Sequence, residues 1–198
     1  MRLERLDSTL VWCGVLAMVS ALSWILAAVI LNPWFRFTRD ALSALGSPGA
    51  TDPWVYNLGL IFTSVLLFAF AASLVDLFNN RIEVVGASFL MVSAIFLALV
   101  GVYHGGTYPH DFVSLWFFVQ ADISVFTTGF GNLVENRQSG AMVLALGTLS
   151  TVLARLIPWQ SSAEVETFGT FAIAAFVLLE TRHALKRLNS HNRVMKED

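Results

Sequence analysis

The sequence predicts an all-α, polytopic membrane protein: a bundle of six transmembrane helices with both termini in the cytoplasm. Of its 198 residues, 56% are hydrophobic and only 13% are charged, whereas an average soluble domain carries about 25% charge. The apolar residues also occur in runs of about 20, the number of helical residues that crosses a hydrocarbon core about 30 Å thick. Six such runs leave only short connections, so we expect a single-domain, multi-pass protein of the cell membrane.

The spans are predicted at about 9–31, 54–75, 84–103, 112–134, 141–157 and 165–180, followed by a basic cytoplasmic tail over 181–198. A signal peptide is the alternative for the first run. That run is apolar from Thr9 to Leu31, and no small-residue cleavage site precedes Asn32, so a retained span is favoured.

The longest connection precedes the second span. Trp34, Phe35 and Phe37 are aromatic residues of the kind found at membrane interfaces, and Trp54 and Tyr56 mark the return into the bilayer. Within this connection the segment 40–46, DALSALG, is predicted to form a short helix that ends at Gly46.

The remaining spans are separated by polar turns. DLFNNRIE precedes the third span, and ENRQSG follows the fourth. The segment HGGTYPHD, between the third and fourth spans, contains two glycines and a proline and therefore forbids a regular helix. Pro158 ends the fifth span.

The distribution of lysine and arginine predicts the orientation. Nine of the twelve basic residues fall in the two termini and in the connections that six spans place on the same side of the membrane as the termini. The other three fall on the opposite side. Basic residues accumulate in the cytoplasm, so the termini are predicted to be inside. The net charge of −2 gives no indication of nucleic-acid binding, and none is expected. Cys13 is the only cysteine, which excludes an intrachain disulfide.

This orientation places the connection before span two and the HGGTYPHD segment on the same outer face. A functional interpretation is a metal-dependent site in which His104, His110 and Asp40, or Asp111 in place of Asp40, bind a metal ion such as zinc with a position open for water. The bound water would then attack an ester or amide. Ser43 and Ser114 would orient the substrate or stabilise charge, and the candidate substrate contacts are Asn57, Tyr103 and Arg155.

Two other interpretations remain open. The same residues could form a metal-free site for a lipid headgroup or small ligand. They could also be structural: the histidines would bond to loop carbonyls, Asp111 would favour the start of span four through the helix dipole, and Asp40 would pair with Arg36 or Arg39.

Asp122 lies near the middle of the fourth span, where a carboxylate is costly unless it faces a cavity, finds a partner or is protonated. It is either the floor of a polar cavity with a catalytic or proton-accepting role, or one partner of a hydrogen bond between helices. Arg155 is expected to extend outward from the fifth span. Glu180 is expected to be solvated at the inner boundary, and the basic tail to contact acidic lipid headgroups.

Several short motifs resemble the DUF998 family of prokaryotic, largely archaeal, membrane proteins of unknown function. They are R-D-x-x-S-x-L-G from Arg39, Y-N-x-G-L from Tyr56, V-G-V-Y-H from Val100, and His110. The resemblance covers about residues 10–185 and implies a six-helix bundle without an assigned activity. Its recurring polar positions would be Asp40, Ser43, Gly46, Asn57, His104 and His110.

The chain is more distantly similar to the ceramidase and adiponectin-receptor-like membrane hydrolases, which have seven spans and bind zinc. It has six predicted spans and lacks an H-x-x-x-H pair in the last one. The sequence therefore predicts a membrane protein with a polar site at the outer face. It is either a metal-dependent lipid hydrolase, a lipid or small-molecule binding or transport protein, or a scaffold without a site. Membrane lipids are the expected partners, and a homo-oligomer is left open.

Overall fold

The computed structural model describes the backbone of residues 2–197 and the side chains of residues 8–190. All regular secondary structure in this part of the chain is helical, and it contains no strand. The long helices are α1 (Arg2–Leu31), α2 (Pro53–Leu77), α3 (Arg81–Val102), α4 (His110–Glu135), α5 (Arg137–Leu156) and α6 (Ser162–Glu197), and a 3₁₀ helix, η1 (Leu42–Gly46), lies between α1 and α2. All six long helices are long and apolar enough to cross a membrane, which confirms the predicted fold class.

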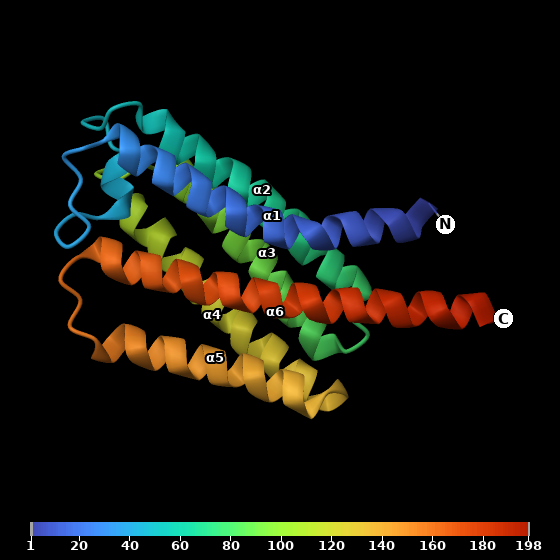
Figure 1. Ribbon diagram of the computed structural model, residues 1–198. Coiled ribbons are helices and arrows are strands. Elements are labelled where there is room, and N and C mark those ends of the chain that lie inside the picture. The colour runs from blue at the N-terminus through green and yellow to red at the C-terminus, as the bar shows by residue number, and fades with distance from the viewer. Residues whose placement is uncertain (1, 198) are drawn as a thin grey trace.

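The helices run up and down, so both termini lie at one end of the bundle, here called the termini end (Figure 1). The other end, here called the loop end, carries η1 and the connections before α4 and α6 (Figure 1). The main contacts join α3 to α2 and α4, α1 to α2, and α4 to α5. Helix α6 closes the bundle against α1 and α5, and α5 is the least buried of the six.

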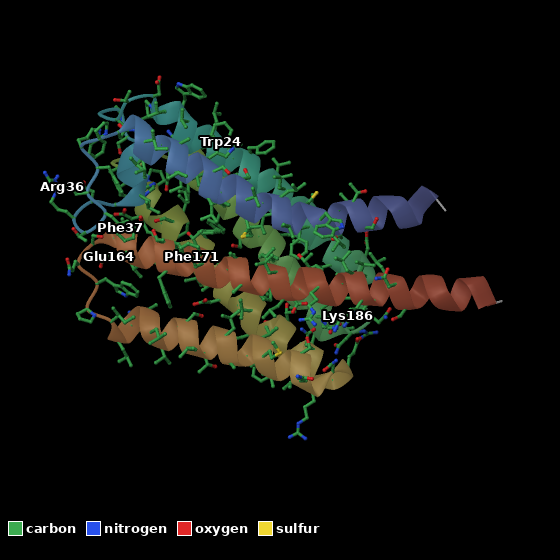
Figure 2. All side chains as sticks on the ribbon, viewed as in Figure 1. Trp24, Arg36, Phe37, Glu164, Phe171 and Lys186 are labelled. Atoms are coloured by element: carbon green, nitrogen blue, oxygen red, sulfur yellow. The ribbon has the colours of Figure 1, made fainter. Side chains whose placement is uncertain are left out.

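The outer faces of these helices are apolar. Leu26, Phe62, Val65, Leu149 and Phe171 are among the large hydrophobic side chains that are more than half exposed, and Figure 2 shows such side chains pointing away from the bundle on several helices. In water this surface would be unfavourable, whereas lipid tails solvate it. The apolar outer surface therefore agrees with the predicted membrane location.

Glycine residues allow α3 and α4 to approach closely. A Cβ atom on Gly86 would lie 2.7 Å from the backbone nitrogen of Thr128, and one on Gly131 would lie 2.7 Å from that of Glu83. The hydroxyl of Ser124 donates to the carbonyl of Gly86 at 2.8 Å. Small residues and interhelical hydrogen bonds of this kind drive helix association in lipid.

At the termini end, a buried ion group joins α6 to α3 and α4. The Arg187 guanidinium lies 2.7 Å from Glu83 Oε1 and 2.6 Å from Glu135 Oε2. It also stands 5.0 Å from the centre of the Phe78 ring, a cation–π distance. The Glu83 side chain is fully buried, so the guanidinium is the partner that makes this burial tolerable.

A second buried carboxylate, that of Glu180, lies about two helical turns before Arg187 on α6. The expectation of a solvated Glu180 was wrong, because its side chain is fully buried. Its Oε1 accepts a hydrogen bond from Asn132 Nδ2 at 2.8 Å, and its Oε2 lies 3.6 Å from His183 Nδ1. Helix α6 continues through the predicted tail because Ala184, Leu185 and Leu188 extend its packed face beyond this carboxylate.

At the loop end, three hydrogen bonds tie the start of α6 to the connection before α2. The Ala163 N–H donates to the carbonyl of Asp40 at 3.1 Å. The Ser161 hydroxyl donates to the carbonyl of Phe37 at 2.6 Å. The Leu42 N–H donates to Glu166 Oε2 at 2.8 Å. The predicted short helix is therefore present as η1, and α6 holds it over the bundle.

The ion group at the termini end can be tested by replacing Arg187 with leucine. Removing the guanidinium leaves Glu83 buried without its charge partner, a change that typically costs about 3–5 kcal/mol. We expect Arg187→Leu to lower the midpoint of thermal unfolding in detergent markedly. Arg81→Leu, which removes an exposed cation from the same end, is the matched control. Equal midpoints for the two variants would contradict the structural role of Arg187.

Candidate functional site

His110 is the first residue of α4 and is directed into the bundle. Its ring is held by a 2.7 Å contact between Nδ1 and the carbonyl of Tyr103. A carbonyl can only accept, so Nδ1 carries a proton, and in the neutral form of the ring Nε2 is then the acceptor. The residue is only 6% exposed. The turn between α3 and α4 therefore fixes both the orientation and the tautomer of His110.

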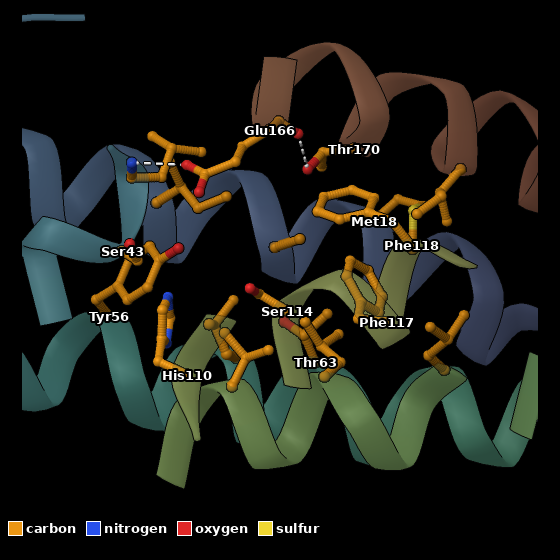
Figure 3. Close-up of a pocket in the computed structure, with 18 residues that line it drawn as sticks. Met18, Ser43, Tyr56, Thr63, His110, Ser114, Phe117, Phe118, Glu166 and Thr170 are labelled. Carbon is orange, nitrogen blue, oxygen red and sulfur yellow. Dashed lines mark hydrogen bonds between the residues drawn. The ribbon is translucent and has the colours of Figure 1, made fainter. Parts of the chain in front are cut away.

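Four more polar side chains surround His110, each from a different part of the chain. Ser114 lies one turn further along α4, Ser43 comes from η1, Tyr56 from α2 and Glu166 from α6. Figure 3 shows His110 and Glu166 extending from opposite sides toward the same space, with Tyr56 and Ser114 on either side of it. Together with apolar residues they line an inner cavity of about 70 Å³.

A larger cleft of about 490 Å³ adjoins this cavity and lies between α4, α5 and α6. The cavity and the cleft share the polar residues Ser43, His110, Ser114 and Glu166. On α5 the cleft is lined by Leu146, Ser150, Thr151 and Ala154, which recur at helical spacing on one face. The polar group at the loop end therefore opens into a space between three membrane-spanning helices.

Asp122 lines this cleft and also makes a contact between helices, so it has a feature of each of its two interpretations. The hydroxyl of Thr151 on α5 donates to its Oδ2 at 3.5 Å, a long hydrogen bond. Asp122 is not enclosed by this contact and remains exposed in the cleft. Ser114 and Asp122 are two turns apart on α4, but the cleft is broad enough to include both.

The electrostatic character of the cleft is acidic. Three carboxylates line it, Asp111, Asp122 and Glu166, and no lysine or arginine between residues 8 and 190 does. The Glu166 carboxylate accepts from the Leu42 N–H through one oxygen. Carboxylates accept several hydrogen bonds each. The cleft therefore offers mainly acceptors, and it suits a molecule that brings hydrogen-bond donors.

The structure does not assemble the predicted metal site. Among the side chains that it describes, no group of three or more His, Cys, Asp or Glu residues is placed to hold a metal ion. Asp40 turns back onto its own connection, where Oδ2 accepts from the Arg36 N–H at 2.7 Å and Oδ1 from Arg39 at 3.1 Å. His104 Nδ1 lies 2.9 Å from the carbonyl of Gly105. Only His110 of the three reaches the cavity.

The predicted substrate contacts also lie elsewhere. Asn57 donates from Nδ2 to the carbonyl of Gly46 at 2.9 Å and so fastens η1 to α2. Tyr103 ends α3 and is 39% exposed, and it contributes its carbonyl to orienting His110. Arg155 is exposed near the end of α5 and does not line the cleft. Of the predicted site residues, Ser43, His110, Ser114 and Asp122 are therefore the ones brought together.

Glu166 and Tyr56 were missed in the sequence. Glu166 falls near the start of the predicted sixth span, two residues after Glu164, and was not considered as a site residue. The position of Glu166 within a span could have indicated a site, because an ionisable residue inside a membrane span usually faces the interior or a cavity. Tyr56 was interpreted as an interfacial aromatic, and only the position of η1 shows that it is buried.

The family of the chain follows from residues 15–183, which match the model described as "Protein of unknown function (DUF998)". This is the family indicated by the short polar motifs. No curated protein and no solved structure matches the chain. Similarity to the ceramidase-like hydrolases stays a prediction. The description of the family assigns no activity, so the function has to be inferred from the cleft.

The ion pair around Asp40 predicts a pH dependence of stability. The Arg36 N–H, assisted by Arg39 and opposed by partial burial, lowers the pKa of Asp40 below its usual 3.8. A lowered pKa in the folded state means that the stabilisation is complete above the unfolded-state value and is lost as pH falls through the folded-state value. We expect Asp40→Asn to unfold at a lower temperature than the wild type at pH 7, and the difference to shrink below pH 3.8. Asp76→Asn, at an exposed position, is the control, and a difference that grows in acid would contradict the assignment.

Proposed function

We propose that this chain, which belongs to the DUF998 family, binds an amphiphile in the cleft between α4, α5 and α6. The polar head of the ligand would donate hydrogen bonds at the loop end, and its apolar chain would lie along the cleft. In this proposal the protein resides in the cell membrane with its loop end facing outward. The observation that carries the proposal is the cleft itself, a mostly apolar space within the spans, with Asp111 and Glu166 at the loop end and Asp122 further along α4.

The size and position of the cleft support a membrane-derived ligand. Small-molecule sites occupy about 300–1,000 Å³, and the cleft, at about 490 Å³, falls within that range. All three of its helices are long and apolar enough to span a membrane, and α5 is the least buried of them. A ligand dissolved in the bilayer could therefore enter beside α5 without passing through water.

The walls of the cleft favour a molecule with two unlike ends. Leu115, Phe118 and Val125 of α4 face Leu146 of α5 and Ile173 of α6 across a largely apolar space. At the loop end, Glu166 and the acceptor nitrogen of His110 stand beside the hydroxyls of Ser43 and Ser114. Hydroxyl-bearing or amine-bearing heads satisfy such acceptors, whereas an acidic head would be repelled by the carboxylates.

The contacts support binding rather than hydrolysis. A serine nucleophile needs a base within hydrogen-bonding reach. Ser114 instead donates to the carbonyl of Asp111 at 3.2 Å. Within the part of the chain whose side chains are described, no hydrogen bond joins Ser43 or Ser114 to His110. Nε2 of His110 therefore serves as an acceptor for the head of the ligand.

A chain-matched set of probes tests the head-group preference. Purified protein in detergent is titrated with dodecylamine, 1-dodecanoylglycerol and laurate, and binding is measured by native mass spectrometry. We expect the amine and the glycerol ester to bind more tightly than laurate. Glu166→Gln replaces a carboxyl oxygen of a half-buried acceptor by an amide NH₂ donor, so it should weaken dodecylamine binding by about tenfold. Glu164→Gln, at the neighbouring acid outside the cleft, should leave it unchanged.

A second pair of variants tests the location. Ala172→Trp places a large ring in the cleft and should abolish binding of the amine and glycerol probes. Leu178→Trp places the same ring at an exposed position of the same helix and should not. Tightest binding of laurate, or equal effects of the two tryptophans, would overturn the proposal.

A further inference from the structure

A second set of ionisable groups lies at the termini end, where α6 carries four basic or titratable side chains within two turns. Two of them face inward: Arg187 pairs with Glu83 and Glu135, and His183 lies against Glu180. The other two, Arg182 and Lys186, are exposed. Among the described side chains, neither pairs with a carboxylate.

Arg182 and Lys186 line the same pocket. It has a volume of about 170 Å³ and lies between α6 and the start of α5. Its other polar lining comes from Asn136, Gln138, Ser139 and His183, and no aspartate or glutamate among the described side chains lines it. Two like charges four residues apart on a helix repel each other. An anion between them would offset that repulsion.

The positive character of this pocket comes from side chains and not from the backbone N–H groups at the start of α5. Asn136 Oδ1 already accepts from the backbone N–H groups of Gln138 and Ser139, both at 3.1 Å. Those two amides are therefore satisfied within the helix cap. A ligand would be held by the guanidinium of Arg182 and the ammonium of Lys186. Figure 2 shows Lys186 at the termini end of α6.

We propose that this pocket binds a phosphate group, supplied by an acidic phospholipid. Phosphate accepts hydrogen bonds from guanidinium and ammonium groups. A lipid is favoured as the source because Met142 and Leu179 continue the lining with apolar side chains, and Met142 is 48% exposed on the outer face of α5. Basic pockets between transmembrane helices are typical sites for acidic headgroups. The site lies at the opposite end of the bundle from the cleft and does not depend on the function proposed for it.

The experiment titrates full-length protein in uncharged detergent with dioctanoyl-phosphatidylglycerol, dioctanoyl-phosphatidylcholine and inorganic phosphate, with bound masses read by native mass spectrometry. We expect the phosphatidylglycerol to bind at least about tenfold more tightly than the zwitterionic lipid, since two basic contacts each contribute about fivefold. Arg182→Gln and Lys186→Gln should each weaken binding of phosphatidylglycerol by about fivefold.

Arg81→Gln is the matched control, because Arg81 is an exposed basic residue at the same end but outside the pocket. It should change binding by less than about twofold, since screening weakens distant charges. Equal losses in Arg81→Gln and Arg182→Gln, or equal binding of the two lipids, would overturn the pocket as a phosphate site. Displacement of phosphatidylglycerol by millimolar inorganic phosphate would overturn the lipid as the source. All variants alter exposed side chains, and an unchanged unfolding midpoint verifies that they fold.

Discussion

The buried pairing of Arg187 with Glu83 and Glu135 is the interaction on which the arrangement of α6 depends. It ties the last helix to α3 and α4 at the termini end. At the loop end, the hydrogen bond from Leu42 to Glu166 ties the same helix to η1. Between these ties α6 packs mainly against α1 and α5, and the cleft lies where it faces α4 and α5. The cleft therefore keeps its shape only while both ties hold α6 in place.

The two ends of the bundle differ in chemistry. Among the described side chains, the cleft that opens at the loop end is lined by three carboxylates and one histidine but by no lysine or arginine. The pocket at the termini end is lined by Arg182, Lys186 and His183, and by no aspartate or glutamate of the same part of the chain. Each complements a different headgroup: hydrogen-bond donors at one end and phosphate at the other. The basic end is also the one that the distribution of lysine and arginine predicts to face the cytoplasm, where acidic lipids give the membrane surface its negative charge.

The six helices could be predicted because a chain in hydrocarbon must satisfy its backbone hydrogen bonds within each segment, and this imposes long apolar runs. The short helix at Leu42 was also predictable, from Gly46 and Pro48. What could not be predicted depends on pairing between helices. Arg187 and Glu83 are 104 residues apart, and nothing local in the sequence indicates that they meet. For the same reason Glu180 was assigned to solvent, and Glu166 was not associated with His110. The three metal ligands were proposed because the predicted topology places them on the same face of the membrane. In the structure, Asp40 and His104 bond to backbone groups of their own connections instead.

If α4, α5 and α6 enclose a space for an amphiphile, an experimental structure in lipid nanodiscs supplemented with 1-dodecanoylglycerol will show the ligand there. We expect elongated density along Phe118 and Ile173, with its polar end within hydrogen-bonding distance of Glu166 and His110. Helix α5 packed directly onto α6, with Asp122 and Thr151 sealed from the bilayer and no space for a chain, would contradict it.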